Sequence, residues 1–346
     1  MNGKKMALFL AGSWVAYQAF RWARQYDLRD KSVLITGSSR GLGLVLARQF
    51  AREGARLTIC ARDPRELDRA REDLAGYGVP VLAVPCDVAD NVQVRLLVEE
   101  VRKEYGQVDV LVNNAGTIGV GPVELMTLDD FEEAMKINFW SALYATLAVL
   151  PGMRQRKEGR IVNITSIGGK IAVPHLLPYD ASKFALVGLS EGMRAELAKD
   201  GIVVTTVVPG LMRTGSPRNA LFKGQHQAEF AWFNISAALP GISTSAEHAA
   251  RRIVAACRRG DAEIVLTLPA QLGVALHGLF PGLTADILSV VNRLLPGPGG
   301  IYTERAKGKE SVSELSPGWL TTLSDQAALE NNEVAPEEAP GPANPA

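Results

Sequence analysis

The hydrophobic periodicity of the chain changes at Lys31, and this change decides the class of fold. From there to Leu268, short apolar runs typical of buried strands alternate with longer stretches of helical pattern. The predicted strands are 32–36, 56–61, 79–85, 108–113, 160–165, 202–208 and 263–268. The predicted helices are 42–52, 65–76, 91–105, 128–150, 179–199 and 245–259. Strands joined by helices form a parallel sheet with helices on both faces. The sequence therefore predicts an α/β fold, with one doubly wound domain over residues 29–268 around a seven-stranded parallel sheet.

Composition narrows the function before any motif is considered. The 346 residues are 47% hydrophobic, which allows a sizeable core. Lysine plus arginine and aspartate plus glutamate number 37 each, so the overall charge argues against a nucleic-acid partner. The three cysteines and four histidines lack the spacing of metal ligands, and the apolar surroundings of the cysteines suit a reducing compartment. We therefore expect neither a disulfide framework nor a metal site.

A glycine-rich turn, Thr36-Gly-Ser-Ser-Arg-Gly-Leu-Gly43, joins the first predicted strand to the first predicted helix. Gly37, Gly41 and Gly43 would allow a tight turn and let the backbone approach a pyrophosphate. The free N–H groups and the dipole of the following helix would face that negative charge. The spacing Gly-x-x-x-Gly-x-Gly is a variant of the dinucleotide fingerprint, and its position between a strand and a helix indicates a Rossmann-type dinucleotide site.

The end of the second predicted strand bears on the choice of cofactor. A carboxylate at this place usually holds the ribose 2′-hydroxyl of NAD. Here Arg62 ends the run, and together with Arg40 it could surround a 2′-phosphate with two guanidinium groups. Asp63 keeps NAD(H) open, although it could instead cap a helix that begins at Pro64. The sequence favours NADP(H) over NAD(H).

Polar residues also follow the third and fourth predicted strands. Asp87 and Val88 come after the third strand, and Asn113-Asn-Ala-Gly116 after the fourth. Open α/β sheets bind ligands at the carboxyl ends of their strands, so Asp87 could bind an adenine and residues 113–116 could line the cofactor. A helix cap at Asp87 and a turn at Asn113 are the structural alternatives. Asn138 lies in an otherwise apolar helical pattern, where an amide needs a partner or a function.

Tyr179 and Lys183 stand four residues apart and share one face if the segment after Pro178 is helical. A nearby ammonium favours the phenolate and lowers the pKa of a tyrosine. Tyr179 could then exchange a proton near neutral pH, while the Ser166 hydroxyl orients a carbonyl or alcohol oxygen. The alternative is a core tyrosine beside a solvated lysine on an amphipathic helix.

The ordered set of motifs resembles the short-chain dehydrogenase/reductase family over roughly residues 30–268. The motifs that carry the resemblance are Thr36–Gly43, Asp87, Asn113–Gly116, Asn138, Ser166, Tyr179-Asp-Ala-Ser-Lys183 and Val208-Pro-Gly210. The resemblance implies that Tyr179 is the acid/base and that Ser166 holds the substrate oxygen. It also implies that Lys183 binds the nicotinamide ribose and lowers the pKa of Tyr179, and that Asn138 holds a water of a proton relay.

The same resemblance implies a set of cofactor contacts and a reaction. The cofactor-binding residues would be Thr36, Gly37, Ser39, Arg40, Gly41, Leu42, Gly43, Arg62, Asp87, Val88, Asn114, Ala115, Gly116, Tyr179, Lys183, Pro209, Gly210 and Thr214. The last three would contact the nicotinamide end. The expected reaction is carbonyl reduction by NADPH or its reverse. A non-catalytic dinucleotide-binding sensor or scaffold, and an epimerase or dehydratase on the same fold, are the alternatives.

Residues 1–28 are predicted to form an N-terminal helix outside the domain. Its apolar run, 6–20, is flanked by basic residues and is shorter than the about 20 residues that span a bilayer. Trp14, Phe20 and Trp22 would suit a helix lying in a membrane interface. A helix packed on the protein's own surface and a signal peptide remain open. We expect a cytoplasmic catalytic domain with a membrane surface as a partner of residues 1–25.

The C-terminal third is expected to determine the substrate. Aromatic residues at 222, 230, 232 and 233 lie where the family carries a lid, and they suit a lipophilic carbonyl or alcohol, or packing of the lid alone. Residues 269–325 are predicted to form a helical extension, with two apolar helices meeting at Pro281-Gly282. This extension could line a substrate channel, rest on a membrane or pack as a hairpin. Residues 326–346 are expected to be disordered. The resemblance suggests a homodimer or homotetramer through helices 128–150 and 179–199.

Overall fold

The computed structural model describes residue 12 and residues 25–334, so nearly all of the predicted N-terminal helix and the end of the predicted tail lie outside the described residues. Seven parallel strands form the central sheet in the order β11-β7-β6-β4-β1-β2-β3. β1 pairs with both β2 and β4. The chain winds outward from β1 through β2 and β3 and then crosses to β4, which makes the carboxyl end of β1 a topological switch point. The predicted doubly wound α/β domain is confirmed.

The strands of this sheet follow the predicted apolar runs closely. They are β1 (Ser32–Thr36), β2 (Arg56–Ala61), β3 (Val81–Pro85), β4 (Val110–Asn113), β6 (Gly159–Ile164), β7 (Ile202–Val208) and β11 (Glu263–Val265). The prediction of a strand up to Leu268 is wrong, because the Thr267 hydroxyl accepts the N–H of Ala270 and starts a helix there.

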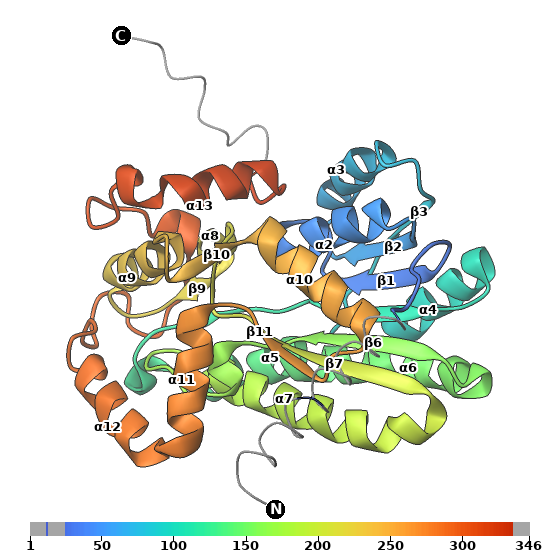
Figure 1. Cartoon of the computed structure of the whole chain (residues 1–346). Coiled ribbons are helices and arrows are strands. Elements are labelled where there is room, and N and C mark those ends of the chain that lie inside the picture. Colours follow the sequence, from blue (N-terminus) through green and yellow to red (C-terminus); the bar gives the residue numbers. More distant parts are fainter. Residues whose placement is uncertain (1–11, 13–24, 335–346) are drawn as a thin grey trace, which may run out of the picture.

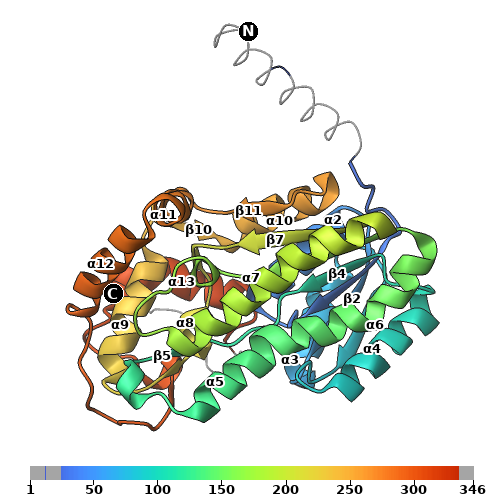
Figure 2. The same ribbon diagram turned by 90° about the horizontal axis from the view of Figure 1, so that it is seen from below.

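Helices cover both faces of the sheet (Figures 1 and 2). One face carries α2 (Gly41–Arg52), α3 (Pro64–Ala75) and α10 (Ala246–Arg259). The other carries α4 (Asn91–Tyr105), α6 (Ser141–Arg156) and α7 (Leu177–Leu197). Each layer buries its own apolar cluster against the sheet, and this double burial explains the continuous Val, Ile and Leu runs in the strands.

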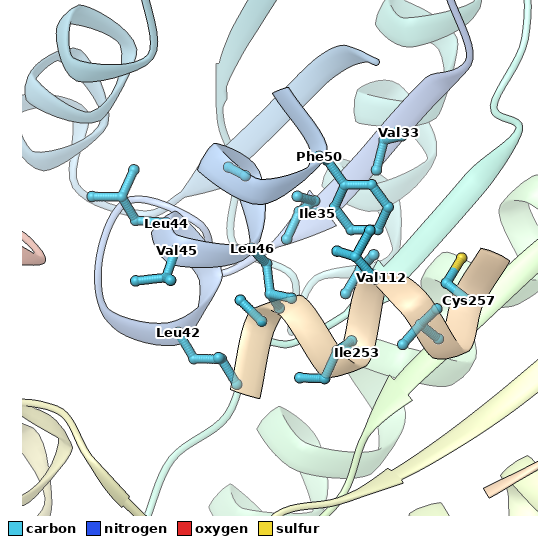
Figure 3. Close-up of a cluster of buried hydrophobic side chains, with 14 of the residues drawn as sticks. Val33, Ile35, Leu42, Leu44, Val45, Leu46, Phe50, Val112, Ile253 and Cys257 are labelled. Carbon is cyan, nitrogen blue, oxygen red and sulfur yellow. The ribbon is translucent and has the colours of Figure 1, made fainter. Parts of the chain in front are cut away.

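The packing of α2 fixes the position of the glycine-rich turn that precedes it. Leu46 and Phe50 of α2 are fully buried between the sheet and α10 (Figure 3). Figure 3 shows Ile35 of β1 beside Phe50, and Ile253 of α10 belongs to the same buried cluster. Because α2 is held on two sides, its N-terminal turn is held rigidly at the carboxyl end of β1.

The helix predicted over 128–150 is interrupted in the structure. It consists of α5 (Leu128–Met135), a π-helical turn (Lys136–Trp140) and α6. The π turn contains Asn138 and places its buried amide toward neighbouring segments instead of within a regular helical face. Hydrophobic periodicity does not predict this single π-helical turn, because the helical spacing of apolar residues continues on both sides of it.

Two small sheets and several helices lie beyond the carboxyl edge of the main sheet. A three-stranded sheet joins β12 (Ala306–Lys307), β9 (Leu221–Phe222) and β5 (Gly119–Val120), and a two-stranded one joins β10 (Ser243–Ser245) and β8 (Leu211–Arg213). The accompanying helices are α8 (Ser216–Asn219), α9 (His226–Ala238), α11 (Leu268–Leu279) and α12 (Pro281–Asn292). Short 3₁₀ turns lie at Val123–Leu125, Ile167–Gly169, Ala198–Asp200 and Gly308–Glu310.

The chain ends, as far as it is described, on helix α13 (Gly318–Glu330), which lies across α8 and α9 and points toward α2 and α3 (Figure 1). The prediction of disorder from residue 326 is therefore wrong for residues 326–334. α13 continues through that boundary, and the residues after it are hydrogen-bonded to α2 and α3. Among the described residues, no helix is both long and apolar enough to cross a membrane.

Candidate active site

The glycine-rich turn adopts a backbone that side chains would prevent. Gly37 and Gly41 have φ values of +62° and +55°, in the left-handed region that favours glycine. A Cβ at Gly43 would lie 2.2 Å from the Gly37 carbonyl oxygen, so a side chain cannot fit there. α2 begins at Gly41 without a side-chain cap from Arg40. The turn thus presents helix N–H groups to the region beyond the carboxyl ends of β1 and β4, here called the groove, an arrangement that fits a bound pyrophosphate.

The ends of β1 and β4 are tied together beside this turn. The Thr36 hydroxyl accepts the backbone N–H groups of Asn114 and Ala115, at 3.0 and 3.1 Å. The Asn114 amide donates in return to the Thr36 and Gly37 carbonyls. Thr36, Asn114 and Ala115 therefore shape the wall of the groove through backbone and amide contacts, and Gly116 follows directly.

The end of β2 differs in part from the prediction. Arg62 is exposed there, but Arg40 forms a 2.7 Å ion pair with Glu66, which also accepts from the Ser39 hydroxyl. The Arg40 guanidinium is therefore already paired. Asp63 accepts the N–H groups of Arg65 and Glu66 and caps α3 ahead of Pro64, so the structural alternative for Asp63 is correct.

The remaining predicted contact residues lie along the same carboxyl edge. Asp87 forms a turn, accepting the N–H of Ala89, and Val88 is buried. On the opposite side, the Pro209 carbonyl accepts the N–H of Ile167, and Thr214 is buried against Ser216. Leu42 points into the core beneath α2, and Gly210 leaves no room for a Cβ beside Thr267. Apart from Leu42, which lies in the first turn of α2, these residues belong to strand ends or the loops after them.

Tyr179 lies at the start of α7 with its phenol beside Ser166. The side chain is partly buried against an apolar cluster that includes Val120, Leu176 and Phe222. Ser166 follows β6, its hydroxyl lies near enough to the phenol to lower the pKa of Tyr179, and it accepts the N–H of Gly168 at 3.0 Å. The two hydroxyl groups predicted to act on the substrate oxygen thus lie close together.

Lys183 lies one helical turn further, 5.7 Å from the centroid of the Tyr179 ring. It is buried, and its Nζ donates to the Ile164 carbonyl at 3.0 Å. Asn138 approaches from the π turn: its Oδ1 accepts the N–H of Thr117, and its Nδ2 donates to the Ser182 hydroxyl at 2.9 Å. A Cβ on Gly116 would lie 3.0 Å from Asn138 Oδ1 and 3.6 Å from Lys183 Nζ, so both side chains lie close to that glycine.

The predicted lowering of the tyrosine pKa by Lys183 is wrong for the chain by itself. Burial raises the pKa of Tyr179 to about 12; the Ser166 hydrogen bond opposes this rise and the Asp180 carboxylate adds to it. Burial also lowers the pKa of Lys183 to about 8. The cost of desolvating a phenolate therefore sets the direction of the Tyr179 shift, and the Lys183 ammonium donates to the Ile164 carbonyl.

Two positions contribute to this geometry without being predicted from the sequence. Ser182 receives the Asn138 amide and donates to the Tyr179 carbonyl at 2.6 Å, so it links the π turn to α7. Glu66 pairs with Arg40 at the other end of the groove. The position of Glu66 three residues after Asp63, in the first turn of α3, is the one sequence signal that could have drawn attention to it.

A glycine-rich turn at the switch point of a parallel sheet, beside a tyrosine, serine and lysine, defines an oxidoreductase that uses a nicotinamide dinucleotide. The short chain dehydrogenase family matches residues 31–221, more than half of the chain. The chain therefore belongs to the short-chain dehydrogenase family.

Individual relatives agree with this assignment. The chain is 32% identical over 286 residues to dehydrogenase/reductase SDR family member 7B of Bos taurus, covering 80% of this chain and 86% of that protein. Gluconate 5-dehydrogenase from Burkholderia cenocepacia, solved with NADP and tartrate, has a TM-score of 0.64 and 27% identity over 72% of this chain and 98% of that one. A short chain dehydrogenase/reductase from Burkholderia phymatum, solved with NAD, shares the fold, with a TM-score of 0.69 and 24% identity over 75% of this chain and 96% of that one.

Proposed function

We propose that the chain is an NADP(H)-dependent oxidoreductase that reduces the carbonyl group of a lipophilic small molecule, or oxidises the corresponding alcohol, with Tyr179 as the acid/base. The observation that carries this proposal is the proximity of the Ser166 hydroxyl to the Tyr179 phenol, with Lys183 and Asn138 both close to Gly116. A protein that only sensed a dinucleotide would not need four polar side chains arranged at one end of the groove.

Each side chain has a separate task in the proposed reduction. The bound cofactor supplies the hydride. The Ser166 hydroxyl donates to the substrate oxygen, and the Tyr179 phenol gives that oxygen its proton as negative charge develops. The raised pKa of Tyr179 keeps the phenol protonated at neutral pH, which suits a proton donor. Lys183 places a positive charge below the ring, and Asn138 holds the π turn against α7 through Ser182.

The surroundings of Tyr179 support a lipophilic substrate. The apolar cluster beside the phenol contains Phe222 and Phe230, and Trp232 and Phe233 of α9 pack against it. These rings come from the region predicted as a lid, and they give the substrate side of the site an apolar wall. An NADPH-oxidation assay, followed by absorbance, against aromatic, steroid-like and long-chain carbonyls tests the substrate class. Tight cofactor binding without turnover on any of them would favour the sensor alternative.

Preference for NADP(H) rests on the end of β2. Arg62 is exposed at the end of β2, where the adenosine ribose is expected, and Asp63 caps α3 through its Oδ1. Arg62→Ala should weaken NADP(H) binding about tenfold or more and leave NAD(H) binding nearly unchanged. Equal losses for both cofactors would contradict the preference.

Attachment to a membrane surface remains part of the proposal. The apolar run 6–20 is preceded by Lys4 and Lys5. Large apolar side chains are exposed on α11, on α12 and between them, among them Leu272, Leu279 and Phe280. Assembly into a dimer or tetramer is supported by exposed Trp140, Leu147 and Phe184 on the helices expected to associate. Fractionation of the full chain and of a chain lacking residues 1–25, with light scattering of each, tests both points.

A further inference from the structure

The residues that follow α13 enter the groove above the glycine-rich turn. The 331–333 segment, Asn-Asn-Glu, leaves the helix with Asn332 in a left-handed conformation (φ +58°). Its entry point is held by two arginines from the dinucleotide-binding half of the sheet. Arg48 of α2 donates to the Glu330 carbonyl and, at 2.7 Å, to Asn331 Oδ1.

The segment then bonds the turn itself. The N–H of Gly41, the first residue of α2, donates to the Asn331 carbonyl at 2.9 Å. Arg69 of α3 donates to Asn332 Oδ1 at 2.7 Å. The amide of the same asparagine donates to the Ser39 carbonyl at 2.8 Å and to the Glu66 carbonyl at 3.0 Å. These contacts join the segment to the turn and to α3, the two elements expected to surround the pyrophosphate and adenosine.

The Glu333 carboxyl group lies between Gly41 of the glycine-rich turn and Gly215 in the loop after β8. Its Oε2 accepts the N–H of Gly215, in the loop after β8. Its Oε1 would be 3.0 Å from a Cβ on Gly41, so the carboxyl group occupies the space beside the start of α2. Backbone N–H groups at such a helix start are the donors that ordinarily face a dinucleotide pyrophosphate.

We propose that the 331–333 segment is a built-in competitor of the dinucleotide: it occupies the pyrophosphate position above Gly41 and must leave before the cofactor binds. This inference rests on the dinucleotide site proposed for the glycine-rich turn. A chain with the segment docked cannot place a pyrophosphate at Gly41. The Glu333 carboxyl group occupies the space beside Gly41, and the Asn331 carbonyl already accepts the Gly41 N–H. The apparent cofactor affinity is therefore reduced by the fraction of chains in which the segment is undocked.

Docking depends on pH through Glu333. Burial raises the pKa of its carboxyl group from 4.5 to about 7, and the nearby Glu66 raises it further. The Gly215 N–H, Arg40 and Arg218 act in the opposite direction and lower it. Because the docked pKa is raised, docking is fully favoured below about 4.5 and weakens as pH rises through about 7. The segment should therefore compete with the cofactor more strongly in mildly acidic solution than in mildly alkaline solution.

The test compares full-length variants in equilibrium binding of NADP⁺ without substrate. Glu333→Ala and Asn332→Ala each remove contacts of the segment and should bind NADP⁺ about 2- to 10-fold more tightly, as expected for losing one hydrogen bond. Glu330→Ala is the matched control, since that exposed carboxylate bonds Gln326 within α13. Glu333→Gln, which stays uncharged, should abolish the gain in NADP⁺ affinity that the unmodified chain shows between about pH 6 and pH 8.

Hydrogen exchange supplies a readout that is independent of activity. The amides of Asn331 and Glu333 donate to Ala327 and Ala328, and saturating NADP⁺ should accelerate their exchange. Unchanged or weaker NADP⁺ binding by both alanine variants, or exchange that NADP⁺ slows, would overturn the inference while leaving the proposed function intact. A chain that binds neither NADP⁺ nor NAD⁺ in any variant would remove the proposed function, and the inference with it.

Discussion

Replacing Lys183 by methionine should make the protein more stable and inactive at the same time. Burial lowers the pKa of Lys183 from 10.5 to about 8. Each pKa unit corresponds to about 1.4 kcal/mol, so keeping this buried lysine charged costs folding roughly 3 kcal/mol at neutral pH. Methionine removes that cost but also the hydrogen bond to the Ile164 carbonyl, worth about 1 kcal/mol. We expect a net gain of about 2 kcal/mol in the free energy of unfolding.

The pH dependence separates this cause from a general packing effect. Between pH 8 and 10.5 the unfolded chain retains the lysine proton that the folded chain has lost, so the unmodified protein gains stability as pH rises through that window. The cost of burying Lys183 in the folded chain falls to about 1 kcal/mol near pH 10. The gain in the free energy of unfolding from Lys183→Met should then nearly vanish. Urea unfolding at about pH 7 and about pH 10 measures both values.

Lys199→Met is the matched control, because Lys199 is exposed just beyond α7. Its effect should stay within about 0.5 kcal/mol at both pH values. A Lys183→Met protein that is destabilised at neutral pH, or whose advantage does not shrink as pH rises, would refute the reasoning. Cofactor turnover should fall by orders of magnitude in the same variant.

Two further substitutions test other parts of the site. Gly43→Ala puts a Cβ 2.2 Å from the Gly37 carbonyl oxygen and should cost about 1–3 kcal/mol of stability and at least about tenfold in cofactor affinity. Gly188→Ala is the control, because a Cβ at that position of α7 would meet no other atom, and it should cost no stability. Equal behaviour of the two variants would contradict the close packing of the turn. Ser166→Ala should lower turnover about 100-fold or more with cofactor affinity retained, as measured by steady-state kinetics and binding titration; turnover within about threefold of the unmodified chain would remove Ser166 from the site.

Much of the fold could be predicted because its causes are local in the sequence. The runs Ser32–Thr36 and Arg56–Ala61 are buried on both faces and therefore read as strands without knowledge of their neighbours. The glycine-rich turn could be predicted for a similar reason, since the positive φ values of Gly37 and Gly41 favour glycine. The π turn around Asn138 was not, because one extra residue per turn leaves the apolar spacing on each side unchanged.

The parts that escaped prediction depend on partners far apart in the chain. Residues 326–334 look polar and unstructured, yet Arg48 and Arg69 hold them across more than 260 positions of sequence. The two-residue strands β5, β9 and β12 likewise exist only through pairing with one another. The predicted direction of the Tyr179 pKa shift was wrong for a related reason. A spacing of four residues indicates that Lys183 is near, but it does not reveal the burial that raises the pKa of the phenol.

The most direct test of the proposed function is Tyr179→Phe in the full-length chain, assayed with a carbonyl that the unmodified protein reduces. Removing the hydroxyl takes away the proton donor but keeps the ring that packs beside Leu176 and Phe222. The variant should still bind NADPH and lose turnover by about 1,000-fold or more. Turnover close to that of the unmodified chain, with NADPH binding intact, would contradict the assignment of Tyr179 as the acid/base.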